Sequence, residues 1–138
     1  MAKKNNIECF GGLTWLTVTG VPFTKTKFGK GISAEILKKI EEMVSIYIVA
    51  KRVPICGAEV EFLRKSFGYS LGRMGAEIGF SSTSILNWER AKKKRLEKDN
   101  EIGVRAWAAD KLKLEISGRF SKLIGISEEQ VPIILNAA

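Results

Sequence analysis

A cluster of short polar side chains between positions 82 and 87 offers hydrogen-bonding chemistry with no acid, thiol or imidazole. An asparagine amide can pair with the N6 and N7 edge of adenine, and serine or threonine hydroxyls donate and accept hydrogen bonds. Ile85 and Trp88, at i, i+3 spacing, predict the inward face of a helix that exposes these polar groups. The alternative is a solvated polar face on which Ser82 only caps the helix. The cluster consists of Ser82, Thr83, Ser84 and Asn87.

A strongly basic run follows this cluster. Residues 90–98, RAKKKRLEK, contain six positive side chains and one acid. The chain as a whole has 23 Lys and Arg against 15 Asp and Glu, a net charge of +8 and a pI of about 9.6. This balance favours a polyanionic partner through counterion release, although the run alone could be a solvated loop. Its positive side chains are Arg90, Lys92, Lys93, Lys94, Arg95 and Lys98.

Three short helices would position these side chains. Apolar residues at helical spacing predict a first helix over about 58–67 and a second over 71–78. A third helix follows across a short turn. Serine is a preferred N-cap, and glycine supplies a left-handed C-terminal stop. The predicted capping residues are Ser70 and Gly79 for the second helix, and Ser81 or Ser82 for the third.

Seven residues in these three predicted helices and their turns form one pattern: Ser70, Met74, Gly79, Ser81, Ile85, Trp88 and Glu89. This pattern resembles that of the phage-repressor-like (Xre/Cro) helix-turn-helix family. The resemblance implies a lambda-repressor-like helix bundle whose recognition helix enters the major groove of double-stranded DNA by its first turn. It places Ser82, Thr83 and Ser84 at the bases, with Asn87 one turn further on as the best base reader. It also places the loop that holds Arg90, Lys92, Lys93, Lys94 and Arg95 near phosphate.

The same resemblance implies an architectural ion pair and reveals two departures. Arg64 on the first helix should pair with Glu89 at the end of the third, next to the structural Trp88. Leu71 stands where the family usually has a glutamine that touches the DNA backbone, and Gly75 stands where a small alanine normally packs. We expect both departures to affect binding more than folding.

The N-terminal part has a different pattern. Residues 13–19 form a β-branched and aromatic run bounded by glycines, which predicts a strand, and residues 23–27 could pair with it as a hairpin. A long amphipathic helix then begins after Ser33 and ends near Arg52, because Pro54 disfavours helical geometry before it. The expected fold class is therefore mainly α with a small N-terminal β-hairpin, an α+β fold.

This arrangement extends the resemblance to the MqsA-type (YgiT-type) antitoxin and regulator group. Many members of that group hold zinc through two Cys-x-x-Cys pairs, which this sequence lacks. The resemblance implies that the hairpin and the long helix contact a protein toxin, while the C-terminal half binds the operator and represses its own gene.

The remaining segments complete the expected domains. Residues 101–115 predict a fourth helix with a buried Trp107, and the apolar tail favours a last helix that covers the core or forms a dimer contact. The expected domains are the hairpin with the long helix over 1–53, a helix-turn-helix DNA-binding domain over 54–118, and a tail helix over 119–138.

Residue usage argues against several other classes. The chain has no histidine, and Cys9 and Cys56 form no metal or redox motif, so we expect no enzyme, no metal and no cofactor. No stretch reaches the roughly 18 apolar residues of a membrane span, and no secretory signal follows the first residues, which favours the cytoplasm.

The sequence predicts a DNA-binding repressor that acts as a homodimer. The alternative is an antitoxin that binds a protein toxin and regulates its own gene.

Overall fold

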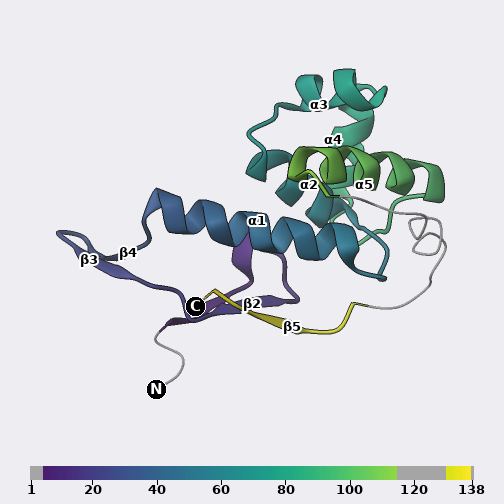
Figure 1. The fold of residues 1–138 in the computed structure, drawn as a ribbon. Coiled ribbons are helices and arrows are strands. Elements are labelled where there is room, and N and C mark those ends of the chain that lie inside the picture. Colours follow the sequence, from purple (N-terminus) through teal and green to yellow (C-terminus); the bar gives the residue numbers. More distant parts are fainter. Residues whose placement is uncertain (1–4, 115–129, 138) are drawn as a thin grey trace. The chain divides into compact units, whose positions relative to one another are not determined.

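The structure is a computed structural model that describes residues 5–114 and 130–137, and these form a mixed α+β fold (Figure 1). The chain divides into two compact units, one of residues 1–44 with 130–138 and one of residues 45–129. Helix α1, Ala34–Ala50, runs from the first unit into the second. No helix among the described residues is long and apolar enough to cross a membrane.

The first unit contains a three-stranded sheet. Strand β2, Leu16–Thr19, lies between β1, Ile7–Glu8, and β5, Ile133–Asn136. It pairs with β1 antiparallel and with β5 parallel. Alternation along β2 buries Leu16 and Val18 completely or nearly so, which places its apolar face on the core of this unit.

Strand β5 corrects the sequence prediction of a tail helix. Residues 133–136 are extended and pair in register with β2, and residues 130–132 and 137 are not helical. The remainder of the predicted helix, 119–129 and 138, lies outside the described residues. Ile133 and Ile134 are β-branched, and Pro132 ahead of them cannot donate a hydrogen bond to a helix. The strand partner lies far away in the sequence, since the Thr19 hydroxyl donates to the Leu135 carbonyl 116 positions later.

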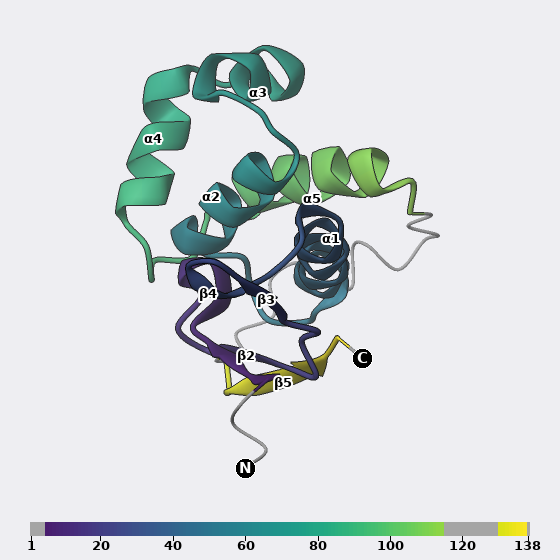
Figure 2. The same cartoon turned by 90° about the vertical axis from the view of Figure 1, so that its left-hand side faces the viewer.

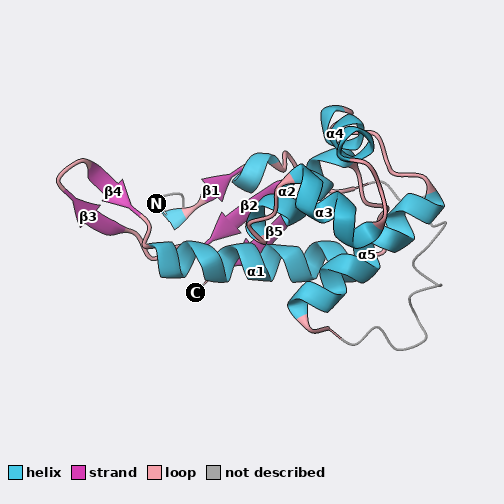
Figure 3. Cartoon of the chain, turned by 90° about the horizontal axis from the view of Figure 1, so that it is seen from above, coloured by secondary structure: helices cyan, strands magenta, loops and turns pink. Residues whose placement is uncertain are grey.

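The predicted hairpin between residues 13–19 and 23–27 is also wrong. Strand β3, Thr24–Thr26, pairs instead with β4, Gly29–Gly31, in a separate two-stranded sheet (Figure 3). Both edges of β2 are occupied by β1 and β5, whereas β3 finds an antiparallel partner across a turn of two residues. Residues Gly29–Gly31, for which the sequence predicted no strand, therefore form the second arm of this hairpin.

Helix α1 follows the prediction closely. The Ile36 amide donates to the Ser33 hydroxyl at 3.2 Å, so Ser33 caps the helix as expected. At 17 residues it is the longest helix in the described part of the chain. In the first unit, Ile40 and Val44 are buried, and Figures 1 and 2 show these turns of α1 lying over one face of the sheet.

Four further helices form the second unit (Figure 2). The bounds predicted for the second short helix agree with α3, and those predicted for the first are one residue late at each end. The fourth helix begins three residues earlier than predicted. The helices are α2, Gly57–Ser66; α3, Leu71–Ile78; α4, Ser82–Arg90; and α5, Lys98–Leu112.

A buried arginine ties α5 to the end of α1 within the second unit. The Arg105 guanidinium donates to the carbonyls of Val49 at 2.7 Å, Lys51 at 2.9 Å and Val53 at 2.9 Å. Its Nε donates to Glu101 at 3.0 Å, one turn earlier on α5. These bonds satisfy carbonyls that the end of α1 leaves without helical partners, and they compensate for burying the charge.

A second buried pair fixes the start of α2. The Lys51 ammonium lies 2.5 Å from the Glu59 carboxylate, and both side chains are almost fully buried. The other oxygen of Glu59 accepts the Cys56 amide at 3.0 Å, which satisfies one of the free amides at the start of the helix.

Gly75 is a packing requirement and not merely a weak helix residue. A Cβ atom at this position would lie 2.3 Å from the Phe80 carbonyl oxygen, where the turn after α3 folds back on the helix. The Phe80 amide donates to the Gly75 carbonyl at 3.1 Å in the same turn. The departure noted in the sequence therefore permits a closer approach of the turn to α3 than alanine would allow.

We expect Gly75→Ala to lower the free energy of unfolding by about 1–3 kcal/mol, because the added methyl displaces backbone in a packed core. Gly103→Ala is the matched control, since its Cβ would meet the Phe80 ring edge at an ordinary 3.7 Å. That control should stabilise the protein by about 0.5–1 kcal/mol. Denaturant unfolding measures both changes. Equal changes in the free energy of unfolding for the two variants would contradict the close approach of the Phe80 carbonyl to Gly75.

Candidate nucleic-acid interface

Helix α4 has one buried face and one exposed polar face. Ile85 and Glu89 are buried at i, i+4 spacing. Thr83, Asn87 and Arg90 are exposed and recur at i, i+4 and i+7, so they form one stripe along the opposite side. The stripe holds hydrogen-bonding groups at its start and a guanidinium at its end.

The three polar side chains predicted for the first turn of α4 differ in exposure and in hydrogen bonding. Ser81 is the N-cap, because its hydroxyl oxygen accepts the Ser84 amide at 3.1 Å. The Ser81 hydroxyl in turn donates to the Ser84 hydroxyl at 2.9 Å. Ser84 is therefore half-buried and engaged in the cap, whereas Ser82 and Thr83 are exposed.

The predicted ion pair between Arg64 and Glu89 is present. The guanidinium donates from Nε at 2.7 Å and from Nη2 at 2.8 Å to the two oxygens of the carboxylate. The third nitrogen, Nη1, donates to the Tyr69 carbonyl at 2.9 Å. The side chains are 12% and 4% exposed, so this two-pronged pair joins α2, α4 and the connection to α3 with little competition from water.

Trp88 packs α4 against the preceding turn and against α2. Its ring meets the Phe80 ring edge-on, with centroids 4.9 Å apart. Its carbonyl lies so close to the start of α2 that a Cβ at Gly57 would stand 1.8 Å from the oxygen. The two contacts hold the end of α4 against α2 and against the turn that precedes it.

The basic run is anchored by its backbone to the start of α2. The amides of Gly57 and Ala58 donate to the carbonyls of Lys94 at 3.2 Å and Lys92 at 2.9 Å. The Leu96 amide donates to the Ile55 carbonyl at 2.9 Å. These bonds satisfy amides at the start of α2, and they fix the loop from which the basic side chains project.

The basic side chains divide into engaged and exposed groups. Lys92 lies 2.5 Å from Glu61, and Arg95 lies 3.8 Å from Glu101. Among the residues that the structure describes, no ion pair is recorded for the exposed side chains Arg90, Lys93 and Lys94.

Arg73 on α3 is a further cation that the sequence reasoning missed. It is exposed, and its guanidinium carbon lies 4.0 Å from the centroid of the Tyr69 ring. Stacking on an aromatic ring orients a guanidinium without using its hydrogen-bond donors. The available signal was the spacing of Tyr69 and Arg73, one turn apart across the start of α3.

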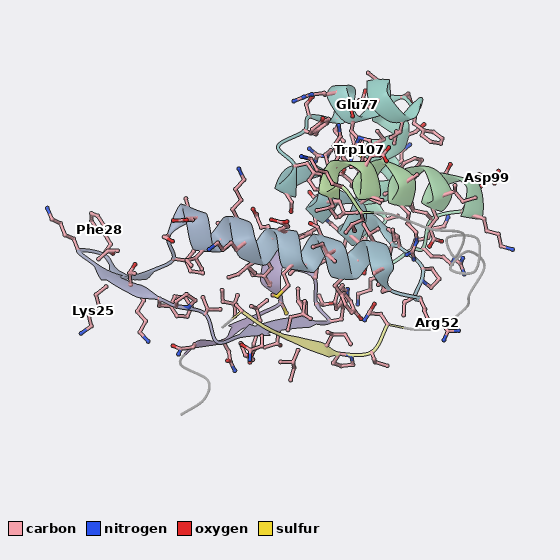
Figure 4. All side chains as sticks on the ribbon, in the orientation of Figure 1. Lys25, Phe28, Arg52, Glu77, Asp99 and Trp107 are labelled. Atoms are coloured by element: carbon pink, nitrogen blue, oxygen red, sulfur yellow. The ribbon has the colours of Figure 1, made fainter. Side chains whose placement is uncertain are left out.

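Glu77 collects three donors that join α3 to α5, and Figure 4 labels it with Trp107. Its carboxylate lies 2.7 Å from the Lys111 ammonium and accepts the Trp107 indole N–H at 3.0 Å. Its other oxygen accepts the Tyr69 hydroxyl at 3.0 Å. These hydrogen bonds, that of Lys111 first, lower the pKa of Glu77 to about 2.

The environment of Cys56 does not activate a nucleophile. Burial raises the pKa of the Cys56 thiol above its ordinary value, which keeps the sulfur protonated. The described residues also contain no group of three or more acids or cysteines placed to hold a metal ion.

Comparison with known proteins identifies no relative, because no family model, curated protein or solved structure matches this chain.

We expect Arg64→Met to lower the free energy of unfolding by about 3–5 kcal/mol, because it leaves the buried Glu89 carboxylate without its partner. The double variant Arg64→Met with Glu89→Met should lose less than the sum of the two single variants. Denaturant unfolding of all four proteins gives the coupling energy. Additive losses would show that the pair contributes no coupling.

We expect Glu77 to make stability depend on pH below about 4.5, its ordinary pKa. The folded-state pKa is lowered, so the ionised carboxylate stabilises the fold above the ordinary pKa, and this contribution is lost as pH falls toward about 2. Unfolding free energies measured across this range should fall less steeply in Glu77→Gln. Lys111→Met should give an intermediate slope, and parallel curves for all three proteins would refute the assignment.

Proposed function

We propose that α2 to α5 form a lambda-repressor-like helix-turn-helix domain and that the chain is a sequence-specific DNA-binding transcriptional repressor. The exposed stripe of Thr83, Asn87 and Arg90 carries this proposal. It lies on a helix that follows α3 across a three-residue turn and that is held from behind by Arg64 and Glu89.

Each part of the stripe has a matching role in a duplex. Asn87 offers both a donor and an acceptor to the N6 and N7 edge of adenine, and the Thr83 methyl can touch a thymine methyl. Arg90 lies nearer the rim of the groove, at the end of the helix, and suits a phosphate. Phosphate contacts position the protein, whereas contacts to base edges carry the sequence information.

The anchored loop extends the phosphate-binding surface. Lys93 and Lys94 project from a backbone that is fixed to α2, so a phosphate contact would order little additional chain. Lys92 and Arg95 lie near the carboxylates of Glu61 and Glu101. These acids partly offset the positive charge that the two side chains would offer to a phosphate. Arg73 adds an oriented cation on α3.

We also propose that the repressor binds as a homodimer. A single α4 presents few base-reading groups, and helix-turn-helix proteins obtain specificity from two half-sites one helical turn apart. A dimer that neutralises about 6–10 phosphates should lose roughly a thousandfold or more in affinity between about 50 and 200 mM salt.

The test is selection of bound duplexes from a random-sequence library, followed by affinity measurements. We expect one enriched, two-fold symmetric sequence. Asn87→Ala should weaken binding to that sequence about 5- to 150-fold, because each bidentate base contact contributes about 1–3 kcal/mol of discrimination. Lys93→Ala with Lys94→Ala should weaken binding to all sequences and reduce the salt slope by about 2.

Asn100→Ala on α5 is the matched control, because it removes the same amide from another helix. It should leave the enriched sequence and its affinity unchanged. If the wild-type chain enriches no sequence, or if Asn87→Ala and Asn100→Ala behave alike while folded, the proposal is wrong.

A further inference from the structure

The β3–β4 hairpin carries an aromatic side chain at its tip. Phe28 is 98% exposed and occupies the second position of the two-residue turn. Figure 4 labels it on this hairpin, and Figures 1 and 3 show the hairpin extending beyond the first turn of α1. Single exposed apolar side chains are common on proteins, so the groups around Phe28 must indicate what it contacts.

The hairpin concentrates positive charge around this ring. Lys25 and Lys30 are directly opposite each other in the antiparallel register, which places two ammonium groups on one face. Lys27 is next to Phe28 in the turn, and the sequence has no acid between Glu8 and Glu35. Like charges opposite each other destabilise a hairpin, so this arrangement favours an anionic partner.

The tip is a turn closed by side-chain hydrogen bonds. The Thr26 hydroxyl donates to the Gly29 carbonyl at 2.8 Å, and its oxygen accepts the Phe28 amide at 3.2 Å. Gly29 has a φ of 107°, a conformation that side chains rarely allow. The ring and the lysines are therefore presented on a short, hydrogen-bonded arm.

We propose that this hairpin is a second DNA-binding element, in which Phe28 wedges into a base step from the minor groove. Lys25, Lys27 and Lys30 would contact the flanking phosphates. Minor-groove proteins frequently combine cations with apolar wedges that partly unstack neighbouring bases. One exposed ring gives a protein or a membrane little apolar area, whereas a base stack accepts one ring between two faces.

The inference rests on the proposed DNA binding but uses residues outside α4. It assigns sequence reading to Asn87 and local deformation of the duplex to Phe28. Because the arm contains no amide or carboxylate side chain, its contacts should depend on charge and on the flexibility of the base step, not on base edges.

The experiment uses the full chain and a mixed-sequence duplex that carries 2-aminopurine, a base whose fluorescence rises when it is unstacked. We expect wild-type protein to raise the fluorescence and Phe28→Ala to abolish the rise. Phe28→Ala should also weaken binding about 5- to 150-fold, the range found for stacking side chains.

Charge variants supply the second readout. Lys25→Gln with Lys30→Gln should reduce the salt slope of DNA binding by about 2, while the melting temperature stays equal or rises because a like-charge pair is removed. Lys38→Gln with Lys39→Gln, two exposed lysines on α1, is the matched control and should leave both the fluorescence and the slope unchanged.

Three outcomes would overturn the inference. The first is unchanged affinity and fluorescence in both arm variants while Asn87→Ala loses sequence preference, which would leave the proposed function standing. The second is absence of any DNA binding by the wild-type chain, which would overturn both proposals. The third is binding of the chain to anionic lipid vesicles that Phe28→Ala abolishes while the DNA affinity of Phe28→Ala stays at the wild-type value.

Discussion

The two-pronged pair between Arg64 and Glu89 determines how α4 can present its polar face. It occupies the buried side of α4 and closes on α2, and it also holds the Tyr69 carbonyl at the entrance to α3. Gly57 brings the backbones of α2 and α4 into direct contact on the same side. With that side fixed, the remaining side of α4 exposes Asn87 and leads into a loop that is itself anchored to α2.

Local signals made this part of the fold predictable. Ser70 and Gly79 bracket α3 as capping chemistry requires, and the bounds predicted for that helix are those observed. The ion pair followed from a family resemblance carried by residues close in sequence. The same locality let the exposed stripe be expected around Asn87, although the cap contact that engages Ser84 could not be foreseen from residue types alone.

Contacts between residues far apart in the sequence could not be predicted from residue patterns. The apolar segment that forms β5 is so short that its composition fits either a helix or a strand. Only its pairing with β2 decides between them. Arg105 carries no local sign that it will bond carbonyls at the end of α1, and Glu77 gives none that three donors will converge on it. The use of Gly75 likewise depends on where the Phe80 carbonyl lies, which is a property of the folded turn.

Residue-resolved NMR on the labelled chain can test the proposed DNA contact without knowledge of the operator. Amide shifts recorded while a duplex is added should change at residues 82–90 and 92–94, and in the 24–31 hairpin, while the buried amides around Arg105 stay in place. Binding accompanied by unchanged shifts along residues 82–90 would contradict the assignment of α4 as the recognition helix.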